Sequence, residues 1–385
     1  MPSSLRHFIV WPMIVGSVTA HCAAQPSASL MRINGLTSAE TPTVEGRILV
    51  TAQDGGLLLE DRSGRIHQLR AGEFQSTEET GQEFVHLNTE ELAASLLRQT
   101  GGAFQIRQTD HYVLCSSATE LYTEYVAQLL EKTHNEFRRF MESLQVPLKD
   151  SAAPLPVIVF GDSDRFLEFA GRQHPETSFA DVPGYYSLRH NQMLITAPSG
   201  MKDYRSRSDV LRELKRRPRQ VETVVHEAVH QLAFNTGVQV RYADNPMWLS
   251  EGLAVYFESA NGRSATLWNR PGEPNRIHLP GAQTCITNEE RFQLSLTDLV
   301  RTDAAFLSAD TAASAYAESW ALVHYLTEKQ PKALGQLLKE LGQRTPLIAV
   351  SPESRVTSLT SAAQQTLSEL ETQVVRHIKR MRGPR

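Results

Sequence analysis

The chain has 385 residues, of which 41% are hydrophobic and 21% charged, a composition typical of globular proteins and not of disordered tails. Its 39 lysine and arginine residues are set against 43 aspartate and glutamate residues, and the net charge of −4 argues against a strongly basic nucleic-acid binder. The length exceeds that of one ordinary compact domain and indicates more than one structural unit.

The first residues have the pattern of a secretory signal. Arg6 precedes an apolar run over residues 8–20, and small residues follow up to Gln25. This pattern predicts a signal peptide over residues 1–24, removed on export to the periplasm or the exterior. Lipidation at Cys22 is the alternative to simple cleavage. We expect no membrane-spanning segment in the rest of the chain.

A β-rich region is expected over residues 25–100. Short apolar runs between glycine-containing turns predict strands within residues 46–70, forming a small antiparallel unit. A helix is predicted over Thr89–Gln99, because Asn88 can cap its start and Glu91 stands three residues later.

Residues 101–200 are predicted to form a mixed α/β half. Apolar periodicity and turn residues define its elements in order. They are a hairpin over residues 104–115, a long helix over residues 118–144, a buried strand over Leu155–Phe160, a helix that begins at Asp162, and a second hairpin over residues 184–196.

Residues 201–385 are predicted to be mostly helical. Helical periodicity is found near residues 221–235, 247–258, 312–328, 331–342 and 361–380, with a long loop over residues 260–295. The basic run within residues 201–220 is interpreted as a solvated approach to the first of these helices, or else as a site that attracts an acidic polymer. The order of elements favours an α+β fold, with an antiparallel sheet beside a helical half.

One motif carries chemistry. His226, Glu227 and His230 form the pattern HExxH within a segment free of glycine and proline. On a helix, residues four apart share one face, so both imidazoles can reach one metal ion. Glu227 projects to the side, where it can act on a water bound to that ion.

A third ligand is expected on the following helix. Zinc in hydrolases takes three protein ligands and leaves one position for water. Glu251 follows His230 by 21 residues, in the sequence WLSEGLA. Asn245 as cap and Pro246 as first residue predict a helix start just before it. The predicted zinc ligands are therefore His226, His230 and Glu251.

HEAVH followed by WLSEGLA resembles the gluzincin metallopeptidases, which include thermolysin-like enzymes and related aminopeptidases. The wider resemblance covers about residues 100–330. It is closest to exported, poorly characterised bacterial gluzincin-like proteins. The resemblance implies a zincin-like core with a small N-terminal β unit, one Zn²⁺ per chain, and hydrolysis of a peptide or protein substrate.

The resemblance also implies roles for matching residues. Glu227 would be the general base and then the proton donor to the leaving amine. Tyr316 would stabilise the oxyanion, with Ser319 standing where the relatives usually have glycine. The hairpin before the active-site helix, with Tyr185 and Tyr186, would be the edge strand along which a peptide lies.

Other polar residues near the motif are given structural roles. Tyr256 is interpreted as a packing residue and His324 as a structural histidine. Glu222 is interpreted as a solvated carboxylate near a helix start. Cys115 and Cys285 either form one disulfide or remain two separate buried thiols.

Two alternatives to the peptidase hypothesis remain open. The first is a non-catalytic zincin-like module that binds peptides or a cell-surface polymer, with zinc structural or absent. The second is hydrolysis of an amide that is not a peptide, since the chemistry of a water on zinc is the same.

Overall fold

The computed structural model describes residues 28–37, 42–180, 182–200, 204–260 and 264–383. The predicted signal peptide, residues 1–24, lies outside these ranges. The described strands are β1 (Ser29–Asn34), β2 (Thr43–Thr51), β3 (Leu57–Asp61), β4 (Ile66–Leu69), β5 (Ser76–Glu83), β6 (Gln105–Gln108), β7 (Tyr112–Ser116), β8 (Leu155–Phe160), β9 (Gly184–Ser187) and β10 (Gln192–Thr196). The described helices are α1 (Thr89–Thr100), α2 (Glu120–Ser143), α3 (Ser163–Gln173), α4 (Arg207–Arg216), α5 (Pro218–Asn235), α6 (Met247–Phe257), α7 (His278–Thr284), α8 (Leu296–Arg301), α9 (Ala304–Leu307), α10 (Ala312–Lys329), α11 (Pro331–Leu341), α12 (Pro352–Ala363) and α13 (Leu367–Arg380).

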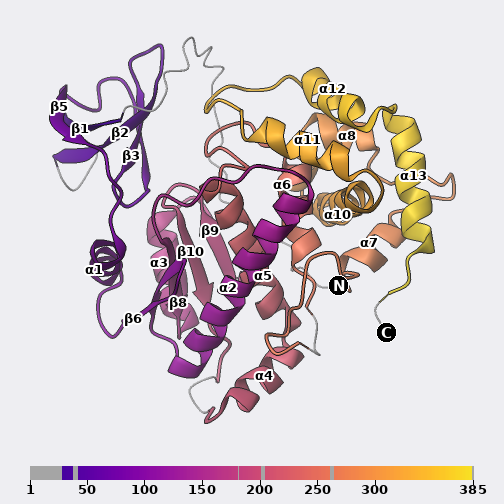
Figure 1. Ribbon diagram of the computed structural model, residues 1–385, viewed down its shortest axis with the longest axis horizontal. Helices are drawn as coiled ribbons and strands as arrows, with labels where there is room; N and C mark the ends of the chain where they lie inside the picture. Colours follow the sequence, from indigo (N-terminus) through magenta and orange to yellow (C-terminus); the bar gives the residue numbers. More distant parts are fainter. Residues whose placement is uncertain (1–27, 38–41, 181, 201–203, 261–263, 384–385) are drawn as a thin grey trace.

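The N-terminal unit is a five-stranded antiparallel sheet with the strand order β4-β3-β2-β1-β5 (Figure 1). The predicted antiparallel unit is confirmed as β2, β3 and β4, whereas β1 and β5 were not predicted. Strand β5 has the sequence STEETGQE, with no apolar residue and no buried position. Because it lacks hydrophobic alternation, its pairing with β1 has no signal in the local sequence.

A second, mixed sheet has the order β6-β7-β8-β10-β9. Strands β7, β8 and β10 are parallel, and the outer strands β6 and β9 pair antiparallel with their neighbours. Both predicted hairpins and the predicted strand β8 are confirmed. Strand β9 therefore lies at one edge of this sheet.

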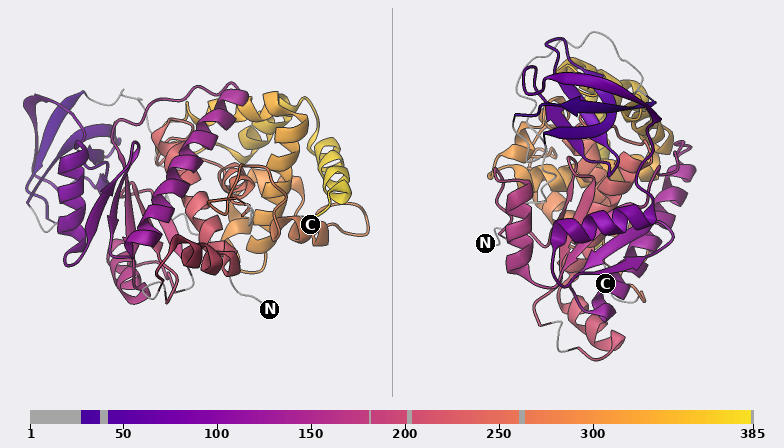
Figure 2. Two further views of the ribbon diagram at one scale, coloured as in Figure 1. Left: turned by 60° about the horizontal axis from the view of Figure 1, so that its bottom comes forward. Right: turned by 90° about the vertical axis from the view of Figure 1, so that its left-hand side faces the viewer.

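Alternating side chains of the mixed sheet pack on opposite faces, as the period of a strand requires. Val113 and Cys115 of β7 point into a core shared with α1 and α3, whereas Tyr112 and Leu114 point into a core shared with α2 and α5. Helices thus cover both faces of the sheet (Figures 1 and 2). The capping box predicted for α1, made by Asn88 and Glu91, is confirmed.

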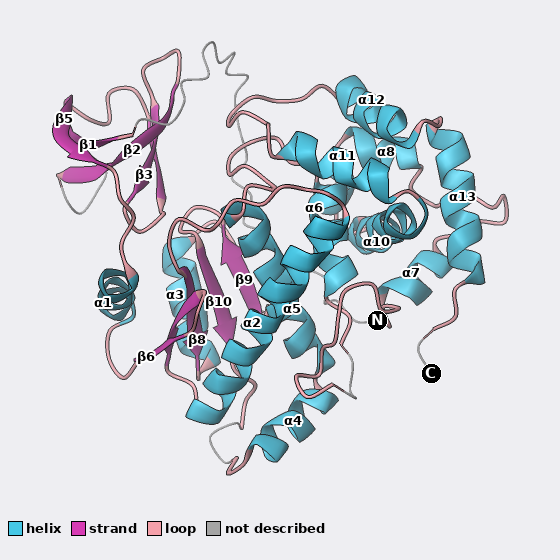
Figure 3. Ribbon diagram, viewed as in Figure 1, coloured by secondary structure: helices cyan, strands magenta, loops and turns pink. Residues whose placement is uncertain are grey.

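The helical region follows the mixed sheet in sequence and lies beside it (Figure 3). Two expectations are wrong here. Helix α7 interrupts the loop expected over residues 260–295. The helix expected over residues 361–380 is two helices, because Gln364 takes a left-handed conformation with φ 53° and Thr366 caps α13.

Apolar side chains join the N-terminal sheet to the rest of the molecule. Val50, Leu58 and Ile66 pack against Tyr186 of β9 and Phe234 of α5. Cys115 and Cys285 are free, buried thiols that belong to different cores, so no disulfide joins them. Among the helices in the described ranges, none is both long and apolar enough to cross a membrane.

Candidate metal centre

Helix α5 carries the HExxH motif in a fully buried stretch. It begins with Pro218 at a position that needs no backbone N–H, and its residues from Gln220 to Phe234 are all buried. His226 and His230 lie one turn apart, and their Nε2 atoms approach to 3.1 Å. The predicted shared face for the two imidazoles is therefore present.

Helix α6 brings Glu251 to this face. Its carboxylate Oε2 lies 3.3 Å from Nε2 of His226, and its Oε1 lies 3.7 Å from Nε2 of His230. The predicted cap of α6 is wrong in detail: α6 begins at Met247, and Asn245 donates instead to the carbonyls of Val240 and Ala243. The second helix nevertheless delivers the carboxylate as expected.

A glycine lets α6 approach α10 closely. A Cβ at Gly252 would lie 2.8 Å from the carbonyl oxygen of Ser319 and 2.8 Å from Cγ2 of Val323. Because only glycine leaves that space, the backbone of α6 packs closely against both the backbone and a side chain of α10 next to Glu251. This close approach also places Tyr316 of α10 beside Glu251 and Glu227.

The donor atoms are close enough together to hold one metal ion. Four ligands at about 2.0–2.1 Å in tetrahedral geometry lie about 3.3 Å from one another. The three distances among His226, His230 and Glu251 run from 3.1 to 3.7 Å, and the group can hold a metal ion. Both carboxylate oxygens of Glu251 are buried, and they face the imidazoles of His226 and His230 and the hydroxyl group of Tyr316. A cation at the centre of the group would satisfy them.

The charges around the group keep Glu251 anionic. Burial raises the pKa of its carboxyl group, but the neighbouring imidazoles of His230 and His226 outweigh burial and lower it to about 2. An ionised carboxylate is the form that binds a metal.

Glu258 supports the site from behind and was not singled out from the sequence. Its Oε2 lies 2.9 Å from Nδ1 of His226, and its Oε1 lies 3.1 Å from Nε2 of His278 and accepts a hydrogen bond from Asn275. A carboxylate on the outer nitrogen of a histidine fixes the ring and directs the other nitrogen to a metal. The sequence offered one signal for this role, the spacing of Glu258 from Glu251. The two residues are two helical turns apart and therefore lie on the same face.

Glu227 faces the edge strand of the mixed sheet. Its Oε2 accepts a hydrogen bond of 2.8 Å from the backbone N–H of Tyr186 in β9. Burial raises the pKa of its carboxyl group to about 8, although the positive charge on His226 opposes the shift. A carboxyl group with such a pKa can both take and release a proton near neutral pH.

Tyr316 also belongs to the surroundings of the group. It is buried, and burial together with the charges of Glu251 and Glu227 raises the pKa of its hydroxyl group well above 10. The phenol therefore keeps its proton and can act as a hydrogen-bond donor. The structure thus brings all five residues selected from the sequence to one place.

The structural roles predicted for Tyr256, His324 and Glu222 have different outcomes. Tyr256 packs against Phe140, with ring centres 5.5 Å apart, which confirms its packing role. His324 lies 3.0 Å from His377, between α10 and α13. Glu222 is buried, and burial and Glu258 raise its pKa to about 8, so its interpretation as a solvated carboxylate is wrong.

Fold and site together define an α+β protein with an N-terminal antiparallel sheet, a mixed sheet and a helical region that holds a buried His-His-Glu group. The profile of a family described as a protein of unknown function (DUF1570) matches residues 220–348. This span contains all but the first two residues of α5 and the whole of α6 and α10, and hence the whole group. No curated protein matches the chain.

Proposed function

We propose that the protein is a zinc-dependent peptidase with a zincin-like core of the gluzincin type. One observation carries the proposal: Glu251 turns two buried carboxylate oxygens toward the Nε2 atoms of His226 and His230, so that the donor atoms of all three residues converge on one point. A buried carboxylate is costly unless positive charge beside it compensates the lost hydration. A zinc ion held by these three residues removes the cost.

Zinc bound there would supply a Lewis acid for the attacking water and for the carbonyl group of the substrate. The protein orients the ligands for this role. Glu258 holds Nδ1 of His226, so the lone pair of Nε2 points into the group. Burial of the group excludes bulk water and strengthens its electrostatic interactions.

The remaining steps belong to Glu227 and Tyr316. Glu227 takes a proton from the attacking water and passes it to the nitrogen of the leaving amine. The hydroxyl group of Tyr316 donates a hydrogen bond to the oxyanion that forms at the carbonyl carbon. A peptide backbone can add alongside β9, the edge strand next to Glu227. The signal peptide that we predict over residues 1–24 would place this activity outside the cytoplasm.

The test uses the mature chain, residues 25–385, and measures zinc content and cleavage of a peptide library. We expect His226→Ala to hold one zinc equivalent fewer than the wild type. We expect Glu227→Gln to keep its zinc and its unfolding temperature but to lose at least about 100-fold in cleavage rate, since the general base is gone. A wild-type chain that takes up no metal at this group would refute the proposal. Bound zinc with peptide affinity that Glu227→Gln leaves unchanged, and no cleavage, would favour the binding module.

A further inference from the structure

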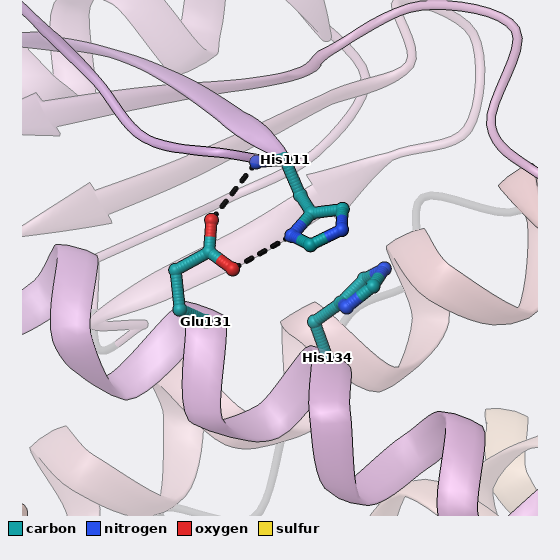
Figure 4. A group of neighbouring side chains, drawn as sticks. All are labelled: His111, Glu131 and His134. Carbon is teal, nitrogen blue, oxygen red and sulfur yellow. Dashed lines mark hydrogen bonds and ion pairs between the residues drawn. The ribbon is translucent and has the colours of Figure 1, made fainter.

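A second group of metal-binding side chains lies on α2 and the β6–β7 hairpin. His111 stands in the turn between β6 and β7, and Glu131 and His134 lie one turn apart on α2 (Figure 4). Glu131 accepts a hydrogen bond of 2.9 Å from the backbone N–H of His111, and its other oxygen lies 2.7 Å from Nδ1 of the same residue. The carboxylate therefore ties the hairpin to the helix.

His134 completes the group from below. Its ring stacks on that of His111, with centroids 3.6 Å apart and planes inclined by 24°. Although His134 is only 6% exposed, its Nδ1 has no hydrogen-bond partner among the described residues. A buried ring nitrogen without a hydrogen-bond partner has lost its hydrogen bonds to water and has gained none in the protein, which is unfavourable. The hydroxyl group of Tyr112, whose ring packs edge-on against His134, is likewise buried and unpartnered in the described structure.

We propose that His111, Glu131 and His134 form a second zinc site, separate from the group on α5 and α6. Each residue offers one ligand atom, and these atoms lie within 4.8 Å of one another. Two imidazoles and one carboxylate are a ligand set suited to zinc and other divalent transition metals. Zinc binding would give the buried Nδ1 of His134 the partner that it lacks.

Zinc binding requires the ring of His111 to turn out of its stack on His134, because the nitrogen lone pairs of the stacked rings lie in nearly parallel planes. Ligands of one zinc ion lie about 3–4 Å apart, which is closer than the widest separation in this group. His111 can supply the movement, because its side chain is 41% exposed and stands in a turn beside the outer strand β6. Glu131 and His134 are fixed on a long helix, and the same Glu-x-x-His spacing binds metals in helical bundles. The exposed side of His111 gives an ion access from solvent.

The role of this site is to fasten the edge hairpin to α2. Helix α2 packs against α5, which carries the HExxH motif, and against β7 of the mixed sheet. An ion that binds only the folded arrangement stabilises it by mass action. Zinc would therefore raise the unfolding temperature through this site without taking part in catalysis.

The experiment titrates Zn²⁺ into the metal-free mature chain against a chromophoric chelator and follows thermal unfolding. The wild type should bind two equivalents, and both His111→Ala and Glu131→Gln should bind one and lose part of the zinc-induced rise in unfolding temperature. The matched control is His67→Ala, because Nε2 of His67 also lies 2.8 Å from a carboxylate oxygen, that of Asp61, and no group of three candidate ligands in the described ranges includes it. This control should still bind two equivalents.

His226→Ala separates the two sites, since it should remove one equivalent while the second remains sensitive to His111→Ala. Should His111→Ala fail to fold, Glu131→Gln decides, because glutamine keeps an acceptor for the backbone N–H of His111. A wild type and a Glu131→Gln variant with equal zinc stoichiometry and equal thermal shifts would overturn the second site and leave the peptidase proposal intact. Loss of zinc in Glu131→Gln but not in His226→Ala would support the second site and refute the first.

Discussion

At the scale of single residues, the buried carboxyl groups near α5 and α10 fall into two sets. Burial raises the pKa of every one of these carboxyl groups. In Glu251 and Glu258, neighbouring histidines outweigh burial and hold the pKa below its ordinary range. Glu222, Glu227 and Glu318 lack enough positive charge beside them, and the pKa of each rises to about 8. The set that stays anionic contains the proposed ligand Glu251 and its support, and the set with the raised pKa contains Glu227, the proposed proton carrier, which exchanges between its two forms near neutral pH.

The anionic state of Glu258 leads to a first prediction. Glu258→Gln should weaken zinc binding at the His226 site by about 10- to 100-fold, because the amide cannot polarise and orient the imidazole as a carboxylate does. Glu318→Gln is the matched control: Glu318 is buried on α10, is mostly protonated at neutral pH, and accepts from the backbone N–H of Leu294, which an amide oxygen can replace. Competition titrations with a chelator measure both affinities. Equal losses in the two variants would contradict this role for Glu258.

The sequence predicted the metal group better than its surroundings. His226, Glu227 and His230 are adjacent on one helix, so helical periodicity alone places them on one face. The prediction of Glu251 as the third ligand required only one further predicted helix, α6. The contact of Glu258 with both His226 and His278 depends on the path of the chain from α6 to α7, for which no local pattern exists.

At the scale of elements, the predictions succeeded where hydrophobic periodicity was strong. Helix α2 and strand β8 are buried on faces that their sequences mark, and both were predicted to within about two residues. Strand β5 pairs through its backbone with polar side chains in solvent, and α7 is a short helix that contains proline and glycine. Their structure comes from tertiary contacts, which local propensity does not record.

The packing of α13 on α10 provides a prediction about pH. His324 of α10 contacts His377 of α13, and the pKa of His324 is lowered to about 4, by burial first and then by His377 and Lys329. An unfolded histidine titrates near 6.5, so the unfolded chain binds a proton that the folded chain rejects as pH falls. The free energy of unfolding should therefore decrease between pH 7.5 and pH 5.5, with at most about 1.3 kcal/mol due to His324.

Urea unfolding of the wild type and His324→Gln at the two pH values measures this contribution. Glutamine does not titrate, so the variant should lose less free energy of unfolding between pH 7.5 and 5.5 than the wild type does. His377, whose pKa burial also lowers, and Glu328 near it remain in both proteins and cancel in the comparison. Identical pH dependence in the two proteins would show that His324 is not kept neutral by the fold.

At the scale of the whole molecule, the N-terminal sheet is attached through both an apolar contact and a charge network. Glu60 of β3 lies 2.5 Å from Arg241, in the segment between α5 and α6, and 2.6 Å from Arg47. Arg241 also donates to the carbonyl of Gly64. A cavity of about 710 Å³ adjoins these residues, between the N-terminal sheet and the end of α5. Because the cavity leaves less apolar packing here, the charges contribute a larger share of the attachment.

This arrangement predicts that a single carboxylate is important for holding the N-terminal sheet in place. Burial opposes the charge on Glu60, yet its hydrogen bond to His86 and the charges of Arg241 and Arg47 lower its pKa to about 2. Glu60→Ala leaves Arg241 nearly buried without its carboxylate, at a cost of about 3–5 kcal/mol in the free energy of unfolding. Glu45→Ala, which breaks the exposed pair with Arg32 in the same sheet, should cost at most about 1 kcal/mol. Urea unfolding of the two variants compares them directly, and equal costs would mean that the sheet is held by its apolar contact alone.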